Sequence, residues 1–213
     1  LQIFQWIHRK GVTDAQQMTD LPGSLRDRLA EDGLRPVLSV TTERRAQDDT
    51  RKLLVAFADQ ATVETVLIPA VSGVGSAGRL ASESEDADSA SVDDQDEDPE
   101  AASANAEVRR VTQCISTQVG CAMGCVFCAS GVTGLTRHLQ PEEIVGQVLE
   151  GRARLDAGEQ LRNVVFMGMG EPLHNYEATA TALRVLLRDD GIGLSSRRVT
   201  VSTSGLVPGI DRL

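Results

Sequence analysis

The stretch Asn163-Val-Val-Phe-Met-Gly-Met-Gly-Glu-Pro172 decides how this chain folds. Its first five residues are almost all apolar, which is typical of a strand buried on both faces of a parallel sheet. Its last five residues form a glycine-containing turn. A helix pattern precedes the stretch at residues 141–149, and another follows it at residues 176–188. This alternation of strand and helix predicts an α/β fold with a parallel sheet.

The flanking segments support this prediction. Residues 141–149 open with a proline and two carboxylates, which suit the first turn of a helix. Apolar positions in residues 176–188 recur at helical spacing. Residues 198–202 form a further strand pattern, and the βα units stop after too few strands to close a barrel. We therefore expect a partial (βα) barrel of parallel strands.

The N-terminal half of the chain has a different organisation. Its first 33 residues show a helical pattern with apolar Ile3, Phe4 and Trp6. Three strand patterns follow and predict an antiparallel meander, and a fourth resumes the sheet later: residues 36–42, 52–57, 62–68 and 109–116. We thus predict three parts of the chain: a helical accessory module at 1–35, an antiparallel β extension at 36–118, and a core truncated at its C-terminus at 119–213.

The formal charge of −10 is concentrated in one segment. Between Glu83 and Glu107 there are 11 acidic residues and no Lys or Arg, which leaves 20 acidic against 21 basic residues elsewhere. Segment 71–107 is expected to be a disordered insertion that replaces a hairpin loop. A mimic of a phosphate backbone is the alternative. Basic residues of the N-terminal module either touch RNA or form a solvated face: Arg9, Lys10, Arg26 and Arg28.

Three cysteines carry the strongest chemical signal. Cys121, Cys125 and Cys128 form a C-x3-C-x2-C run, and thiolates are the ligands that iron–sulfur clusters take. Three ligands leave one iron of a 4Fe–4S cluster open to a substrate. A zinc site is the alternative, with a fourth ligand from Cys114, His138 or His174. Disulfide pairing among the three clustered thiols is less favoured, because the chain shows no secretory segment.

The sequence also limits the cellular setting. No run of about 18 apolar residues is present, so no membrane-spanning segment is expected. The N-terminus lacks a charged and then apolar leader. We therefore expect a cytoplasmic protein. Because the chain starts at Leu1 and stops just after a strand pattern, we also expect it to be a fragment.

Three segments are expected to meet at one edge of the sheet, since ligands of parallel α/β folds bind at the carboxyl ends of the strands. The cysteine loop is predicted to follow the first barrel strand. Residues 168–172 and 202–205 follow the next two strands. Gly168 and Gly170 would let the backbone approach a ligand closely. Glu171 offers a carboxylate to a ligand ammonium.

These motifs resemble a known family. The cysteine run with Phe127 directly before its last cysteine resembles the radical S-adenosylmethionine superfamily, in which the methionine moiety chelates the open iron. Further stretches resemble the RlmN group of RNA adenine C2-methyltransferases: Gln2-Ile-Phe-Gln-Trp6, Val63-Glu-Thr-Val-Leu-Ile-Pro69, Gln118-Val-Gly-Cys121, Gly168-Met-Gly-Glu-Pro-Leu173 and Val199-Thr-Val-Ser-Thr-Ser-Gly205-Leu-Val-Pro-Gly209. The resemblance covers nearly the whole chain except the acidic segment, which the family pattern lacks.

The resemblance implies two cofactors, a 4Fe–4S cluster and S-adenosylmethionine. The three cysteines of the run would bind the cluster. Gly170 and Glu171 would contact the amino group of S-adenosylmethionine, and Ser202 would contact its ribose or nearby atoms. A radical-SAM core is the fold that the resemblance implies for residues 119–213.

Two further roles follow from the resemblance. Glu64 matches the proton acceptor, and Cys114 matches one of two catalytic cysteines. The second, which becomes methylated, has no counterpart in this chain, whose last cysteine is Cys128. The resemblance also implies a disulfide bond. Without the family resemblance, Cys114 would be interpreted as a buried strand cysteine.

The implied reaction transfers a methyl group to C2 of an adenine in 23S ribosomal RNA and in tRNA, through a methyl-cysteine. The implied partners are these RNAs and an electron donor such as flavodoxin or ferredoxin, with the protein a monomer. Two alternatives stay open. One is an adenine C8-methylating radical enzyme of the resistance type, and the other is a non-catalytic iron–sulfur module that binds RNA.

Overall fold

A computed structural model of the chain describes residues 1–33, 36–70, 108–132 and 134–213. The acidic segment 71–107 lies outside the described residues, and so do the predictions made for it. The strands on either side of it, β3 (Thr62–Pro69) and β4 (Arg109–Cys114), pair antiparallel. This pairing agrees with an insertion between two hairpin strands.

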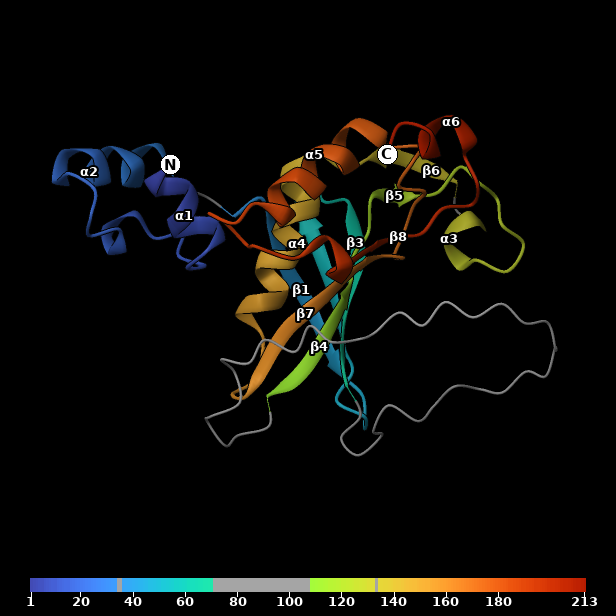
Figure 1. Cartoon of the computed structure of the whole chain (residues 1–213), viewed down its shortest axis with the longest axis horizontal. Helices are drawn as coiled ribbons and strands as arrows, with labels where there is room; N and C mark the ends of the chain where they lie inside the picture. The colour runs from blue at the N-terminus through green and yellow to red at the C-terminus, as the bar shows by residue number, and fades with distance from the viewer. Residues whose placement is uncertain (34–35, 71–107, 133) are drawn as a thin grey trace, which may run out of the picture.

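A six-stranded mixed sheet forms the centre of the structure (Figure 1), in the order β1-β2-β3-β4-β7-β8. Its remaining strands are β1 (Leu38–Arg45), β2 (Arg51–Phe57), β7 (Glu159–Phe166) and β8 (Val199–Val201). The first four strands pair antiparallel, whereas β4, β7 and β8 pair parallel. The predicted α/β fold is confirmed, and β4 is the strand at which the antiparallel extension joins the parallel part.

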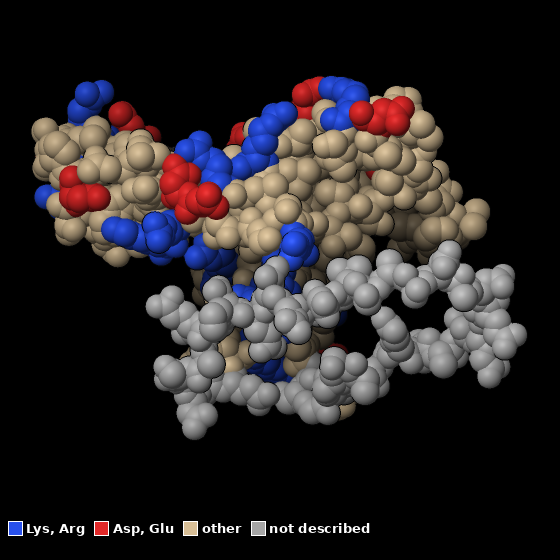
Figure 2. Space-filling view, in the orientation of Figure 1, with Lys and Arg blue, Asp and Glu red and all other residues tan. Residues whose placement is uncertain are grey.

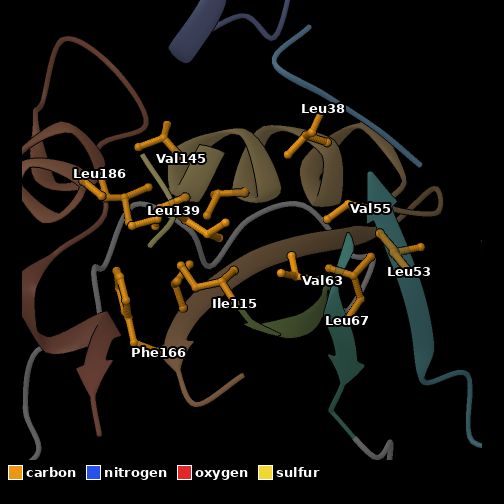
Figure 3. Close-up of a cluster of buried hydrophobic side chains, with 14 of the residues drawn as sticks. Leu38, Leu53, Val55, Val63, Leu67, Ile115, Leu139, Val145, Phe166 and Leu186 are labelled. Carbon is orange, nitrogen blue, oxygen red and sulfur yellow. The ribbon is translucent and has the colours of Figure 1, made fainter. Parts of the chain in front are cut away.

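The core lies between one face of this sheet and two neighbouring helices, α4 (Pro141–Ala153) and α5 (Tyr176–Leu187). Figure 3 shows side chains of the sheet, such as Val55 and Val63, pointing toward α4. Val55 and Val63 are direct cross-strand partners, so they lie on the same face. Burial of each such side chain contributes about 1.5–3 kcal/mol. α4 and α5 thus cover one face of the sheet and do not cover the opposite face (Figure 1).

The start of α4 follows from its sequence. Pro141 occupies the first turn, and Gln140 and Glu143 form a reciprocal capping box. Glu143 also binds Arg137, which pairs with Asp59 at the turn between β2 and β3. The helix is therefore anchored at its N-terminus to the antiparallel part of the sheet.

The N-terminal helices α1 (Gln2–His8) and α2 (Gly23–Asp32), joined through η1 (Ala15–Gln17), lie to the left of the sheet in Figure 1. Arg152 of α4 donates hydrogen bonds to the carbonyl oxygens of His8 and Arg9, at 2.7 and 3.2 Å. These bonds satisfy carbonyls at the end of α1 that have no partner within the helix. The module is thereby attached to the end of α4.

A two-stranded hairpin was not predicted. β5 (Gln118–Gly120) pairs antiparallel with β6 (Leu135–His138), and the cysteine loop and α3 (Ala129–Val132) lie between them. The loop therefore follows β5 rather than the first parallel strand, β4. Short segments complete the described chain: η3 (Ser196–Arg198) and α6 (Val207–Ile210). No helix among the described residues has the length and apolar character needed to cross a membrane.

Candidate active site

Three segments meet beyond the carboxyl ends of the parallel strands. Residues 168–172 follow β7, residues 202–205 follow β8, and the cysteine loop follows β5. A chain of hydrogen bonds joins the first two to Gln118 on β5, the strand that leads into the cysteine loop. The backbone N–H of Glu171 donates to Gln118 Oε1 at 2.8 Å, and the carboxylate of Glu171 accepts from the backbone N–H of Ser204 at 2.6 Å.

Glu171 is the only ionisable member of this chain of bonds. Its side chain is buried, and its second carboxylate oxygen accepts the backbone N–H of Leu173 at 2.9 Å. Burial alone would raise the pKa of this carboxyl. Hydrogen bonds from Ser204, Leu173 and Thr203 outweigh burial and lower the pKa below its ordinary value of 4.5. Glu171 is therefore a buried carboxylate at neutral pH, and no cation of the described residues contributes to its lowered pKa.

The glycines of residues 168–172 serve the contact with residues 115–118. A Cβ on Gly168 would lie 2.6 Å from Ser116 Oγ, and one on Gly170, whose φ is +104°, would lie 2.6 Å from Gln118 Cβ. The space that the absent side chains leave is filled by protein. These contacts give the two glycines a structural reason of their own, beside the ligand approach that the sequence predicts.

The backbone supplies further links between the same two segments. Thr117 N–H donates to Met169 O at 2.8 Å, and Met169 N–H donates to Ser116 Oγ at 2.9 Å. Asn175 donates both amide protons, to Thr117 O and to Leu139 O. Residues 115–118 and 168–175 therefore form one hydrogen-bonded unit next to the cysteine loop.

The four cysteines of the chain are free thiols. The disulfide bond that the family resemblance implies is therefore not found, and this expectation is corrected. Three of the thiols lie on one loop. Cys114 lies at the end of β4, and β5 comes between it and that loop along the chain.

The loop thiols suit a cluster better than a single metal ion. Among the residues that the structure describes, no three His, Cys, Asp or Glu side chains converge on one metal position. Structural zinc takes four ligands around one ion, and the loop supplies three thiols. A 4Fe–4S cluster would be held by cysteine thiolates, which are the donors that this loop supplies. The donor set, three unpaired thiols on one loop, thus fits a cluster.

The cysteine loop exposes large apolar side chains. Val126 and Phe127 lie almost fully in solvent, and Val132 of α3 is similarly exposed. In Figure 2 charged residues gather over the N-terminal helices and the upper edge, whereas the right-hand part of this face carries few charges. Exposed apolar side chains mark a contact surface where they form one contiguous patch.

Glu64 and Cys114 lie on the face of the sheet opposite α4. Cys114 is the cross-strand partner of Val66, so Glu64 is its diagonal neighbour on that face. The Glu64 carboxylate pairs with Lys52 Nζ at 2.9 Å. Burial raises the pKa of the Cys114 thiol, and a hydrogen bond from the backbone of Met167 offsets only part of that effect.

Cys114 is consequently a protonated thiol at neutral pH, and it becomes a nucleophile only when another group accepts its proton. The Lys52–Glu64 pair lines a hollow of about 250 Å³ together with Thr42, Arg44 and Leu54. This hollow opens on the same face as Cys114. Ser202, the remaining predicted residue, is exposed directly after β8.

Sequence reasoning missed several residues that position the site. Gln118, Asn175 and Lys52 were not singled out for a role. Gln118 belongs to the motif Gln118-Val-Gly-Cys121, and its position three residues before the first cysteine of the run was the sequence feature that could have identified it. Lys52 is identified only once strand register places it beside Glu64.

The fold and this site define a protein of the radical SAM class. The family model described as the radical SAM superfamily matches residues 115–213. A crystal structure of a radical SAM methyltransferase from Sphaerobacter thermophilus is similar, with a TM-score of 0.76 and 39% identity over 99% of this chain and 52% of that one.

The N-terminal module narrows the class. A model described as the ribosomal RNA large subunit methyltransferase N-terminal domain matches residues 1–33. The chain is 66% identical over 212 residues to the dual-specificity RNA methyltransferase RlmN of Sorangium cellulosum, covering 100% of this chain and 54% of the relative. It is 41% identical over 218 residues to that of Anaeromyxobacter dehalogenans, covering 100% and 49%. The chain belongs to the RlmN family and spans about half the length of these relatives.

Proposed function

We propose that the protein methylates C2 of an adenine in 23S ribosomal RNA and in tRNA, using a 4Fe–4S cluster and S-adenosylmethionine. The observation that carries the proposal is the buried Glu171 carboxylate, which is bonded to the segment after β8 and, through its backbone, to the strand that leads into the cysteine loop. A carboxylate without a cation, beside three free thiols, suits a ligand that carries an ammonium group.

In this proposal Cys121, Cys125 and Cys128 hold the cluster. The bound cluster supplies the electron that cleaves S-adenosylmethionine. Glu171 and Gly170 contact the amino group of S-adenosylmethionine. The Glu171 carboxylate accepts hydrogen bonds from Ser204, Leu173 and Thr203, all uncharged, so its negative charge is left to pair with that group. Ser202 offers its exposed hydroxyl to the ribose or to atoms nearby.

Glu64 and Cys114 act on the RNA. Because burial keeps Cys114 protonated, its thiol needs a proton acceptor before it assists release of the base. Glu64 is the carboxylate on the same face of the sheet and is the proposed acceptor. Its carboxylate lies 2.9 Å from Lys52 Nζ, which holds it on that face.

The proposed partners are ribosomal RNA and tRNA, with flavodoxin or ferredoxin as electron donor, and the protein is proposed to act as a monomer in the cytoplasm. The N-terminal module is a proposed RNA contact. Two of the four basic residues named for this role already make internal contacts, since Lys10 lies over the Trp6 ring and Arg26 donates to Gln16 O. We retain the predicted parts, 1–35, 36–118 and 119–213, as a proposal for domain organisation.

The experiment uses a chimera in which this chain is joined to the remaining sequence of the Sorangium cellulosum relative. After anaerobic reconstitution, ribosomal RNA and tRNA are treated and the methylated nucleoside is identified by mass spectrometry. Methyl at C2 of adenine supports the proposal. Methyl at C8 would support the resistance-type alternative, and a bound cluster without cleavage of S-adenosylmethionine would support a non-catalytic module.

A further inference from the structure

We propose that Gln118 is a positioning residue that couples the cysteine loop to the loop of Glu171, with its amide held in one orientation by His138 and His174. The inference rests on the proposed function, because it assigns to Gln118 the placement of a residue that contacts S-adenosylmethionine.

The side chain of Gln118 is fully buried at a junction of three elements. Gln118 itself lies on β5, three residues before Cys121. Its Oε1 meets the backbone N–H of Glu171 at 2.8 Å, in the loop after β7. Its Nε2 meets the Nδ1 atoms of His138, on β6, at 2.9 Å and of His174, before α5, at 3.2 Å.

The chemistry of these partners fixes the orientation of the amide. A backbone N–H only donates, so the Gln118 atom that faces Glu171 has to be the oxygen. The other atom is then the NH₂ group, which has two protons and faces two imidazole nitrogens. One proton goes to each histidine, and all hydrogen-bonding capacity of the NH₂ group is used.

A consequence follows for the histidines. Both Nδ1 atoms have to accept, so each neutral ring carries its proton on Nε2. The two rings also contact each other edge to face, with centroids 5.0 Å apart. Each ring is thus held both by the amide and by its neighbour.

The coupling reaches the candidate cofactor residue through the backbone. Gly170 packs directly on the Gln118 side chain, where a Cβ would lie 2.6 Å from Gln118 Cβ. The next residue donates to Gln118 Oε1, and its carboxylate then binds Ser204. A change at Gln118 therefore shifts the Glu171 carboxylate without touching the thiols.

The first measurement is the tautomer of each histidine by nitrogen NMR of the ¹⁵N-histidine-labelled chain. The chain contains three histidines, so His8→Gln assigns the remaining signals. The expected result is an unprotonated Nδ1 and a protonated Nε2 in both His138 and His174. A proton on Nδ1 of either ring in the wild type would overturn the proposed amide orientation.

The second measurement is affinity for S-adenosylmethionine in the reconstituted chain. Gln118→Met removes the bonds to both histidines and the bond to Glu171. It should weaken binding about tenfold at unchanged iron content, as expected for loss of the one hydrogen bond that reaches Glu171. The matched control is Gln113→Met, a buried glutamine that binds Thr65 and Gln147 instead, and it should keep the affinity. Unchanged affinity in Gln118→Met would overturn the positioning role.

Gln118→Glu separates the bond to Glu171 from the bonds to the two histidines. It also provides the test if Gln118→Met does not fold. It keeps an oxygen for the Glu171 N–H but has no proton for the histidines. Affinity should stay within about threefold of wild type, while at least one Nδ1 becomes protonated. Loss of affinity equal to that of Gln118→Met would overturn the role of the Glu171 bond. Wild-type chain that shows the expected tautomers but no binding of S-adenosylmethionine would overturn the proposed function instead.

Discussion

The two ends of the parallel strands are both held by buried polar groups, but their charges are arranged differently. At the amino ends, the buried Arg51 pairs with Glu159 and donates to Arg154 O at 2.6 Å. Arg109, Asp49, Asp156 and Arg45 extend this pairing into a network of alternating charge. At the carboxyl ends, Glu171 accepts hydrogen bonds only from uncharged groups, those of Ser204, Leu173 and Thr203.

The difference separates a structural network from a binding site. A buried charge is costly unless an opposite charge or strong hydrogen bonds compensate it. Each charge at the amino end has an opposite charge nearby, so that end needs no ligand. Glu171 is stabilised by hydrogen bonds alone and keeps its negative charge, so this end has an unneutralised carboxylate that a cationic ligand can complete.

The largest expected effect lies at the carboxyl end. Replacing Cys121, Cys125 or Cys128 by Ala should abolish cluster binding, because a cluster already short of one protein ligand loses a second. Iron and sulfide content after anaerobic reconstitution measures the effect. Cys114→Ala is the control and should keep its iron. Iron lost from Cys114→Ala, or retained by all three loop variants, would contradict the assignment of ligands.

At the amino end, Arg51→Met should cost about 3 kcal/mol of unfolding free energy, because it leaves Glu159 buried without its main partner. Urea unfolding measures the loss. The double variant with Glu159→Leu should recover most of it, since both charges are then absent. Loss of stability in the double variant as large as in Arg51→Met would show that the pair is not the cause.

A smaller effect is expected for Glu171→Gln, which keeps the shape of the side chain and removes its charge. Affinity for S-adenosylmethionine should fall about thirtyfold, near 2 kcal/mol, the size of a hydrogen bond to a charged group. Glu177→Gln is the matched control, because Glu177 is an exposed carboxylate of α5 paired with Arg212. Equal affinity of both variants would remove the proposed role of Glu171.

The smallest effect concerns pH. Burial, and then the neighbouring His174, lower the pKa of His138 below its ordinary value of 6.5. Between the folded pKa and pH 6.5 the unfolded chain binds more protons, so stability is full above 6.5 and falls as pH drops through this window. Urea midpoints in His138→Gln should depend less on pH there than those of the wild type. An identical pH dependence would contradict the neutral state of His138.

Long apolar runs made much of the fold predictable. Residues 52–57 and 62–68 correspond closely to β2 and β3, and the pattern that begins at Pro141 corresponds to α4. The β5–β6 hairpin was missed because its strands are short and lack an apolar period. It depends on a contact, since Gly120, with φ +75°, approaches the Gly134 carbonyl too closely for any Cβ.

The residues of the candidate site could be predicted from the sequence, but the contacts between them could not. The motif residues Cys121, Glu171 and Ser202 were identified by type and order along the chain. Sequence does not reveal what a glycine approaches, and Gly168 and Gly170 turned out to approach residues 115–118. It also does not show which side chains stabilise Glu171, because Gln118 and Ser204 are distant from it along the chain.

Spectroscopy of the reconstituted wild-type chain, before and after addition of S-adenosylmethionine, tests whether the three loop cysteines hold a cluster with one open iron. We expect about four irons and four sulfides per chain, and a change in the signal of one iron on addition, because three cysteines leave one iron open to the ligand. Tightly bound zinc without iron–sulfur absorbance, or a cluster whose spectrum S-adenosylmethionine leaves unchanged, would contradict it.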